Sequence, residues 1–253
     1  MAVASRSPSF LAREDWKTVP WSAGTSVKDV MQHLLDVVVE IPAYLSKFDT
    51  FMDSLQAGNM SQAEVSSTNA ALCAIVDGIH ARLKRWKRDW ADTYPLGQPK
   101  GLDMQPAEND PNPFPTFQCL DQNTMTLITP QSIFYPDLFI AYTLCTFYST
   151  SLILSAADLR TREKGAIQPD ERYTWACNIC RSIEFFVRNV PGYQISRVLF
   201  SIRVAYDTFP EDTIERTFVQ RVLVWIGTRY HLRSCLELIP DMSATKAGNS
   251  IIS

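Results

Sequence analysis

The stretch DERYTWACNICRSIEFFVRNVPGYQISRVLFSIRVAYDTFPED, residues 170–212, decides the fold. It predicts two helices, 170–189 and 193–209, that are apolar on nearly every side and are joined by a short Pro191-Gly192 break. A helix that is apolar all round is stable only when other elements surround it. We therefore expect an all-α fold in which this helix pair is buried.

The most regular pattern lies upstream, after a capping signal formed by Ser61 and Glu64. Apolar residues recur at helical spacing along a predicted helix 62–93, which the Tyr94-Pro95 step ends. The apolar side, which we expect to be buried, carries Leu72, Ile75, Val76, Ile79, Leu83, Trp86 and Trp90.

Caps and breaks place other helices. Ser26 is expected to cap a helix 26–40, and a proline separates this helix from a second piece, 43–55. The last strong helix is predicted to open at Asp212, with Glu215 completing its cap. No segment shows a convincing strand alternation.

Residues 138–157 contain no charged side chain and are about long enough to span a bilayer. The same run holds six Ser and Thr side chains, which weakens a membrane interpretation. We expect instead a central helix that begins near Pro136, ends near Lys164 and is surrounded by other helices, with no membrane partner.

A proline-rich segment, 95–130, contains seven prolines and two glycines, so no helix is expected there. Loops of this length are usually functional lids or partly disordered connectors. Phe114, Phe117, Leu120 and Leu127 could lie across the body of the protein, and we favour a packed lid over a linker.

The domain organisation predicted is an N-terminal arm over 1–24, one helical domain over 25–240 and a tail over 241–253. The domain should contain about six to eight helices around a buried central helix. The N-terminus lacks the apolar core of a signal peptide, and the six cysteines are scattered as in reduced intracellular proteins. We expect a nuclear or cytoplasmic location.

The charge balance argues against direct nucleic-acid binding, because a formal net charge of −3 lacks the excess of Lys and Arg that phosphate binding needs. The basic run RLKRWKR, residues 82–88, resembles a nuclear-localisation or phosphate-binding patch. Asp89 and Asp92 each follow an arginine by four residues. We therefore interpret the run as a solvated helix face, partly neutralised by ion pairs.

The sequence carries no metal or cofactor signature. Cys177-x-x-Cys180 supplies only two ligands and lies on an apolar helix side, so both cysteines are expected to be buried and structural. His33, His80 and His231 lie on separate predicted helices, and no phosphate loop or dinucleotide fingerprint occurs. We expect no metal and no cofactor.

Glu184 stands out because it projects from the same apolar side as the two cysteines, where a bare carboxylate is costly. Arg181 and Arg188 flank it at i−3 and i+4, close enough to pair with it. One interpretation is an internal salt bridge that fixes helix packing. The other is a carboxylate that lines a pocket.

Three segments carry a resemblance to a known family: LKRWKRDWADTYP at 83–95, the apolar run at 134–155, and ACNICRSIEFF at 176–186. Over roughly residues 27–238 the chain resembles the C-terminal fungal-specific regulatory domain of zinc binuclear cluster (Zn2Cys6) transcription factors. This resemblance implies an all-α domain that mediates repression, dimerisation or effector response, often in fungal secondary metabolism. The DNA-binding zinc cluster of that family has no counterpart in this sequence.

Two functions remain open. The first is a regulatory or ligand-sensing module that lacks its own DNA-binding domain and acts through an apolar small molecule, a protein partner or a homodimer. The second is a biosynthetic enzyme whose apolar pocket assists cyclisation or isomerisation of a polyketide or terpenoid. Candidate catalytic residues are Glu184, Arg181, Asp137 and Tyr135, and candidate ligand-pocket residues are Tyr142 and Tyr206.

Overall fold

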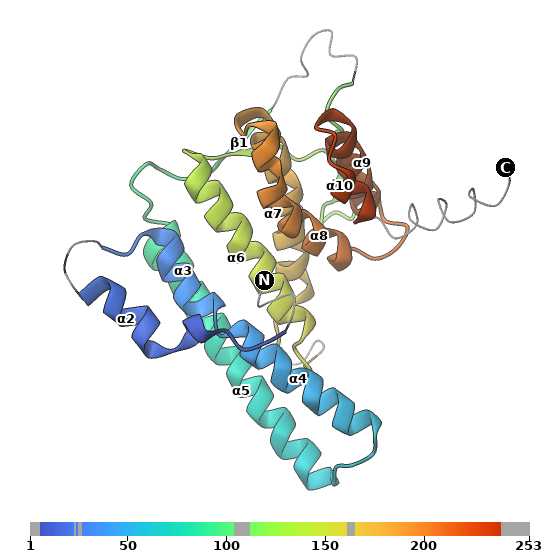
Figure 1. Ribbon diagram of the computed structural model, residues 1–253. Helices are drawn as coiled ribbons and strands as arrows, with labels where there is room; N and C mark the ends of the chain where they lie inside the picture. The colour runs from blue at the N-terminus through green and yellow to red at the C-terminus, as the bar shows by residue number, and fades with distance from the viewer. Residues whose placement is uncertain (1–5, 23, 25–26, 104–111, 161–164, 239–253) are drawn as a thin grey trace, which may run out of the picture. The chain divides into compact units, whose positions relative to one another are not determined.

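The computed structural model describes residues 6–22, 24, 27–103, 112–160 and 165–238 (Figure 1). Helices account for 66% of the described residues and strands for 5%, so the all-α fold class is confirmed. The chain forms two compact units: residues 1–98 with 150–172, and residues 99–149 with 173–253.

The division between the units falls inside two helices, α6 (Leu138–Ala156) and α7 (Pro169–Asn189). The remaining helices each belong to one unit. The first unit holds α2 (Glu14–Ser22), α3 (Val30–Val38), α4 (Ile41–Gln56) and α5 (Gln62–Trp86), and the second holds α8 (Leu199–Thr208), α9 (Ile214–Arg229) and α10 (Arg233–Glu237).

Helices α4 and α5 lie side by side, joined by a tight turn (Figure 1). Gly58 adopts φ +66° in this turn, a conformation that glycine tolerates without steric cost. Ser61 and Glu64 form the predicted reciprocal capping box at the start of α5. The predicted apolar stripe is buried at Leu72, Val76, Ile79, Leu83 and Trp86.

The start of α3 differs from the prediction. The helix begins at Val30 and is capped by Asp29, whose side chain accepts from the backbone N–H of Gln32 while the Gln32 side chain accepts from Asp29. Asp29 therefore takes the capping role that was expected of Ser26, but for a helix that starts four residues later. Ser26 itself lies outside the described residues.

Trp90 was predicted to be buried, and this is wrong. The α-helical hydrogen bonding of α5 gives way to a π-helical turn, Lys87–Ala91, which shifts the later residues around the helix axis. Ala91 consequently occupies the buried side, and Trp90 is 41% exposed. Its ring stacks on His33 with 3.6 Å between centroids.

The π turn also changes the ion pairs of the basic run. Lys87 pairs with Asp92, five residues on, at 2.6 Å, and Arg88 pairs with its neighbour Asp89 at 2.7 Å. Asp89 and Asp92 therefore do not form the predicted ion pairs with the arginines four residues before them. The other pairs of the run are Arg82 with Glu40 and Lys84 with Glu171.

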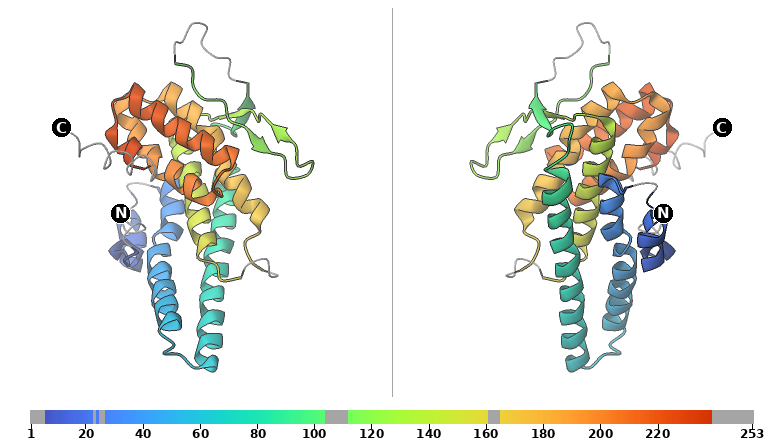
Figure 2. Two further views of the ribbon diagram at one scale, coloured as in Figure 1. Left: turned by 90° about the vertical axis from the view of Figure 1, so that its right-hand side faces the viewer. Right: turned by 90° about the vertical axis from the view of Figure 1, so that its left-hand side faces the viewer.

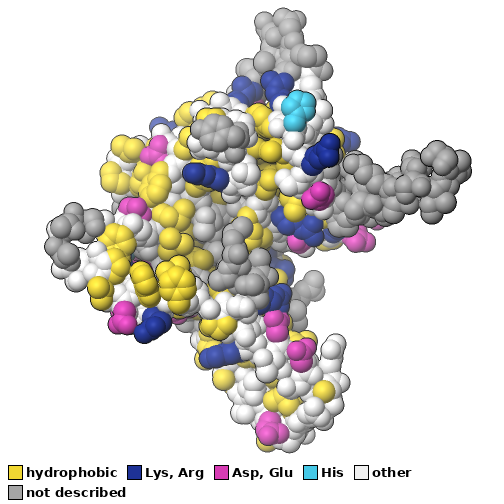
Figure 3. All heavy atoms as spheres, viewed as in Figure 1, with side chains coloured by type: hydrophobic (Ala, Val, Ile, Leu, Met, Phe, Trp, Pro, Cys, Tyr) yellow, Lys and Arg dark blue, Asp and Glu magenta, His cyan; other side chains and the backbone are white. Residues whose placement is uncertain are grey.

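The N-terminal segment forms a short 3-10 turn, Phe10–Ala12, followed by α2. Hydrophobic side chains gather on the surface of α2 (Figure 3). Trp16 is 52% exposed and Val19 62% exposed, so these side chains of the predicted arm are largely open to solvent.

Helix α6 begins after Asp137, whose side chain accepts from the backbone N–H of Ile140 at 2.8 Å. It ends at Ala156 rather than near Lys164 as predicted. This is the one helix in the described part of the chain that is long and apolar enough to cross a membrane, and 72% of its apolar window is buried inside the protein.

Helix α7 is buried along most of its length, as predicted. After the Pro191-Gly192 break the chain forms a 3-10 helix, Gly192–Val198, before α8 begins at Leu199. The predicted helix 193–209 is therefore α-helical only in its second part. The two buried residues Cys177 and Cys180 confirm the predicted burial of this pair.

The cap of α9 was also misassigned. Thr213 is the N-cap and accepts from the backbone N–H of Arg216. Asp212 lies one residue outside the helix at φ +60°, in the left-handed region. Glu215 is only 3% exposed and turns toward other elements of its unit.

The proline-rich segment and its continuation form short strands that the sequence did not predict (Figure 2). Strand β1 (Lys100–Leu102) pairs antiparallel with β4 (Ser132–Phe134), and β2 (Cys119–Leu120) pairs antiparallel with β3 (Leu127–Ile128). Two or three residues are too few for an alternating pattern to be visible in the sequence.

Candidate functional site

The second unit contains a pocket of about 380 Å³ between the proline-rich segment and two helices. The segment and the strand that follows it contribute one side, and α7, α9 and the residue after α9 contribute the other. The lining residues are Leu102, Asp103, Pro113, Phe114, Pro115, Thr116, Phe117, Thr129, Pro130, Gln131, Ser132, Glu184, Val187, Arg188, Trp225, Arg229 and Tyr230.

One wall of the pocket is aromatic. The Trp225 ring meets Phe114 edge-on, with 5.4 Å between centroids and 83° between planes. It meets Tyr230 in a similar way at 6.1 Å and 77°. Edge-to-face contacts of this kind are favourable and fix the ring planes relative to one another. The wall is therefore preorganised to receive a flat apolar group.

The part of the pocket around Glu184, which lies on α7, is polar rather than apolar. Its two carboxylate oxygens accept separately, one from the Arg188 guanidinium at 2.7 Å and one from the Ser132 hydroxyl at 2.7 Å. The Glu184 side chain is 14% exposed and that of Arg188 is 38% exposed. The carboxylate is thus both a partner in an ion pair and a lining group of the pocket.

Two further charged residues complete the lining. The Asp103 carboxylate accepts from the Gln131 side-chain amide at 3.2 Å. The Arg229 guanidinium lies over the Trp225 ring, 5.3 Å from its centroid, in a cation–π geometry. Two acidic and two basic side chains therefore line the pocket, and their formal charges cancel.

The proline-rich segment is held to the helices by hydrogen bonds at several points. The Trp225 indole N–H donates to the backbone carbonyl of Asn112 at 2.9 Å. Arg181 donates through Nε to the backbone carbonyl of Gln131 at 2.8 Å. These bonds connect the segment, and the residue that directly follows it, to α9 and α7.

A third attachment lies at Leu120, whose backbone N–H donates to the Tyr173 hydroxyl at 2.9 Å and to Glu215 at 3.2 Å. The Tyr173 hydroxyl itself donates to the Glu215 carboxylate. Burial, together with this hydrogen bond, raises the pKa of the Tyr173 phenol well above its usual value. The phenol remains protonated and keeps strand β2 attached to α7 and α9.

The position of Tyr230 depends on a glycine. A Cβ atom on Gly192 would lie 2.5 Å from the Tyr230 ring, so only glycine fits there without a shift. The Tyr230 hydroxyl donates to the backbone carbonyl of Val187 at 3.3 Å. Close approach to Gly192 and this bond to α7 together hold one edge of the aromatic wall.

Of the six candidate site residues, Glu184 alone lines this pocket. Arg181 does not pair with Glu184 in the hydrogen bonds of the described residues. It binds the carbonyl of Gln131 and the Asn178 side chain instead. Arg181 is therefore a residue that positions the segment beside the pocket.

Asp137 and Tyr135 have structural roles. Asp137 caps α6. Tyr135 is 1% exposed and shares a hydrogen bond with Ser182 at 2.6 Å. Burial raises the pKa of the Tyr135 phenol well above its usual value. Neither residue is in the pocket lining, and their expected catalytic role has no support in this geometry.

Tyr142 and Tyr206 also lie away from the pocket lining. The Tyr142 ring packs on Phe186 with 4.8 Å between centroids. Tyr206 is 1% exposed and is covered by the Arg216 guanidinium, 4.4 Å from its ring centroid. Both tyrosines are packing residues of the helical core, so their assignment to the ligand pocket is not supported.

Sequence reasoning missed the pocket's aromatic wall as a site. Phe114 was recognised only as an apolar residue of the proline-rich segment, and Trp225, Arg229 and Tyr230 were not named as site residues. The weak signal was the close spacing of Trp225, Arg229 and Tyr230, which puts an aromatic residue and a cation one helical turn apart. Ser132 could not be found, because 52 residues separate it from Glu184.

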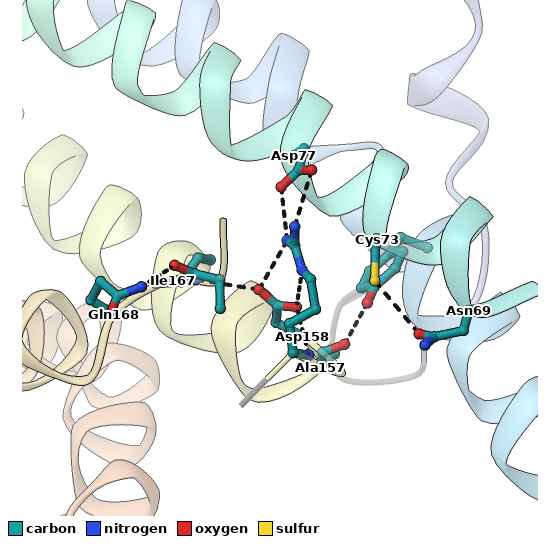
Figure 4. Close-up of polar contacts among 10 residues, drawn as sticks. Asn69, Cys73, Asp77, Ala157, Asp158, Ile167 and Gln168 are labelled. Carbon is teal, nitrogen blue, oxygen red and sulfur yellow. Dashed lines mark hydrogen bonds and ion pairs between the residues drawn. The ribbon is translucent and has the colours of Figure 1, made fainter. Parts of the chain in front are cut away.

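A second polar cluster lies in the first unit, where the chain leaves α6 (Figure 4). Arg160 donates to Asp158 at 3.0 Å and to Asp77 at 2.7 Å. Asp158 also accepts from the backbone N–H of Ile167 at 3.3 Å. The adjoining carbonyl of Ala157 accepts from the Tyr44 hydroxyl. Every group of this cluster is engaged within the protein, so it is a structural tie.

Metal binding has no candidate within the described residues, where no group of three or more His, Cys, Asp or Glu side chains is placed to hold an ion. A comparison of the chain with protein-family models, with curated proteins and with solved structures found no match. The argument for function therefore rests on the pocket.

Proposed function

We propose that this chain is a ligand-sensing regulatory module that binds a small, planar, partly polar molecule in the pocket beside the proline-rich segment. The pocket itself carries this proposal. Its volume of about 380 Å³ lies within the range of about 300–1,000 Å³ that is typical of small-molecule sites. A module that acts through protein contacts alone needs no such pocket.

The chemistry of the ligand follows from the two sides of the pocket. The wall formed by Phe114, Trp225 and Tyr230 favours a flat ring system. Glu184 is already paired with Arg188, and the charges of the lining cancel, so a ligand with a large net charge gains little. A neutral aromatic compound with hydroxyl or carbonyl groups fits these constraints better than the wholly apolar ligand expected from the sequence.

A regulatory role is supported by the way the pocket is built. A ligand there would touch both the proline-rich segment and the helices that hold it. Binding would then strengthen or weaken the attachment of the segment to the helices. A change in that attachment would alter the surface that the protein presents to a protein partner or to a second copy of the chain. The sequence resemblance to fungal regulatory domains supports the same role, in the nucleus or cytoplasm, connected with secondary metabolism.

A second candidate function is enzymatic, and the observation in its favour is the half-buried Glu184 carboxylate at the edge of the aromatic wall. Cyclisation or isomerisation of a polyketide or terpenoid intermediate requires shape, exclusion of water and one or two polar groups. The pocket offers such groups in Glu184 and Ser132.

Thermal unfolding of the purified chain with a series of matched probes tests the proposal. The probes are 2-naphthol, 2-naphthoate, 2-naphthylamine and the non-planar cyclohexanol. A probe that binds only the folded protein stabilises it by about 2.7 kcal/mol at one hundred times its dissociation constant. We expect 2-naphthol to raise Tm most and cyclohexanol least.

The matched controls are two equal substitutions on different surfaces. Val187→Trp fills the pocket, whereas Val224→Trp adds the same side chain at an exposed position of α9 outside the lining. The stabilisation should disappear in the first variant and persist in the second. No response to any planar probe, or an equal response in the filled variant, would contradict the proposed site.

The enzymatic alternative is distinguished by following the fate of a natural ligand captured from an extract of the source organism. A sensor releases the compound with unchanged mass and structure. An enzyme converts an excess of it, and the conversion should be lost in Glu184→Gln while binding persists.

A further inference from the structure

We propose that Cys119 and Cys177 are an oxidation site, at which hydrogen peroxide forms a reversible disulfide that covalently joins the proline-rich segment to α7. This inference is independent of the ligand in the pocket. It concerns two residues that do not line the pocket, and it has its own test.

The geometry brings the two cysteines together from distant parts of the sequence. Cys119 lies in strand β2, and the next residue, Leu120, donates its backbone N–H to the Tyr173 hydroxyl at 2.9 Å. Tyr173 lies one helical turn before Cys177 on α7. The backbone of β2 therefore lies against the turn of α7 that carries Cys177.

The two side chains also meet. The Cys177 thiol donates a hydrogen bond to the Cys119 sulfur, and both cysteines are free thiols in this structure. A disulfide requires the sulfurs to approach to about 2.05 Å. The contact between the two side chains, and the attachment of Leu120 to Tyr173 beside them, favour this approach.

The environment gives the two thiols different roles. The hydrogen bond from Cys177 lowers the pKa of Cys119. Burial and the nearby Glu215 carboxylate oppose this effect, and Arg181 assists it. The same hydrogen bond, together with burial, raises the pKa of Cys177. Cys119 is therefore the attacking thiol and Cys177 the resolving one.

The chemical step is balanced with one molecule of peroxide. The Cys119 thiolate attacks a peroxide oxygen, the S–O bond forms, the O–O bond breaks, and the departing hydroxide takes up a proton as water. Cys177 then attacks the sulfenic sulfur, the S–S bond forms, and the hydroxyl leaves with the Cys177 proton as a second water. Two thiols are oxidised, and one peroxide is reduced to two waters.

Other cysteines provide internal controls. Cys145 and Cys235 are buried at 2% and 0% exposure, and burial raises the pKa of each thiol, to about 12 and about 11. Cys180 is 1% exposed, and burial raises its pKa well above the usual value. A thiol in such surroundings reacts slowly with peroxide. Cys119 is also buried, at 6% exposure, but its pKa is lowered rather than raised. Among the buried cysteines, oxidation is therefore expected to select the pair that joins β2 to α7.

A bond at this place would add a covalent link beside an existing attachment. The Leu120 backbone already depends on Tyr173 and Glu215 for its contact with the helices. Joining residues far apart in sequence restricts the unfolded chain. We expect oxidation to raise Tm by roughly 5 °C or more and to be reversed by dithiothreitol.

The experiment treats the reduced full-length chain with hydrogen peroxide, blocks remaining thiols by alkylation, and maps the peptides by mass spectrometry. The expected result is one disulfide-linked peptide pair containing Cys119 and Cys177, lighter by about 2 Da than the two thiol peptides. Loss of alkylation at these two positions should be complete before Cys145, Cys180 or Cys235 is affected.

Variants sharpen the result. Cys119→Ser and Cys177→Ser should each abolish both the linked peptide and the rise in Tm, whereas Cys235→Ser should leave both unchanged. The peptide map of the wild-type protein tests the proposed disulfide even if a variant folds poorly. A disulfide between any other pair, or oxidation of Cys119 only to separate sulfinic or sulfonic acid, would overturn the proposal, and so would a wild-type map with no disulfide.

Discussion

Two arginine–carboxylate ion pairs in this protein lie in different surroundings and have different roles. Arg160 binds Asp158 and Asp77 within the first unit, with side-chain exposures of 12% for the arginine and 4% for Asp158. Arg188 binds Glu184 within the second unit, with exposures of 38% and 14%. The Arg160–Asp158 pair is enclosed, although Asp77 is 56% exposed, whereas the Arg188–Glu184 pair borders a pocket of about 380 Å³.

The difference lies in what surrounds each ion pair. The Asp158 carboxylate also accepts a hydrogen bond from the backbone N–H of Ile167. This ion pair therefore holds the connection that follows α6 in place. Glu184 lines a pocket that is also lined by aromatic rings, and its other oxygen accepts from a hydroxyl rather than from the backbone. An ion pair therefore indicates a binding site only where space and complementary surfaces accompany it.

The largest effect is expected from Arg160→Met. Removing the guanidinium leaves Asp158 buried without its cation, which costs about 3–5 kcal/mol. Urea unfolding followed by circular dichroism measures this loss. Arg88→Met, which breaks the exposed pair with Asp89, should change little. If the two variants lost equal stability, the contrast between enclosed and open pairs would fail.

A smaller loss is expected from Gly192→Ala, which would place a methyl group 2.5 Å from the Tyr230 ring. Overpacking of this kind costs about 1–3 kcal/mol, and the displaced ring should also weaken binding of 2-naphthol. Gly78→Ala is the matched control because open space surrounds that helical position. It should stabilise the protein by about 0.5–1 kcal/mol. Destabilisation of equal size in both variants would show that Tyr230 does not depend on Gly192.

The third prediction concerns pH and Glu40. Hydrogen bonding from Arg82, above all, lowers the pKa of Glu40 to about 2 from 4.5; burial opposes this and Lys17 assists it. Because the folded pKa lies below the unfolded one, the stabilisation is complete above about pH 4.5 and is lost as pH falls toward 2. After allowance for solvent screening, about 1 kcal/mol is involved.

The measurement is the difference in unfolding free energy between wild type and Glu40→Gln as a function of pH. The difference should shrink between pH 4.5 and 2 as the wild-type carboxylate takes up its proton. A difference that stayed constant over this range would show that the Glu40 carboxylate keeps no special interaction in the folded protein.

The smallest effect on stability, together with a partial loss of binding, is expected from Glu184→Gln. The amide keeps an oxygen for Ser132 but loses the charge that holds the half-exposed Arg188, so the loss should be below about 1 kcal/mol. Affinity for 2-naphthol should fall about tenfold, equivalent to 1.4 kcal/mol. A variant that no longer folds would instead assign Glu184 to the same structural class as Asp158.

The sequence predicted most of the helices because their caps and apolar stripes are local. Ser61 with Glu64, and the stripe from Leu72 to Trp86, depend on residues within a few turns of one another. The burial of Trp90 was predicted wrongly because a π turn changes the angular position of the residues in it and after it around the helix axis. No local sequence feature predicts that turn.

The pocket was only partly accessible to sequence reasoning, for a physical reason. The Glu184–Arg188 ion pair is a local i,i+4 contact, so the sequence predicted it as one of two interpretations of Glu184. The approach of Ser132 and the edge-on packing of Phe114 on Trp225 depend on the path of the proline-rich segment. The directions in which Tyr142 and Tyr206 point depend in the same way on tertiary packing.

Native mass spectrometry with an extract of the source organism tests the central claim most directly. Wild type, Val187→Trp and Val224→Trp would be incubated with the same extract and compared. A non-covalent small-molecule adduct of defined mass is predicted on wild type and on Val224→Trp, and none on the pocket-filled Val187→Trp. No adduct on wild type, or the same adduct on all three proteins, would contradict a ligand site beside the proline-rich segment.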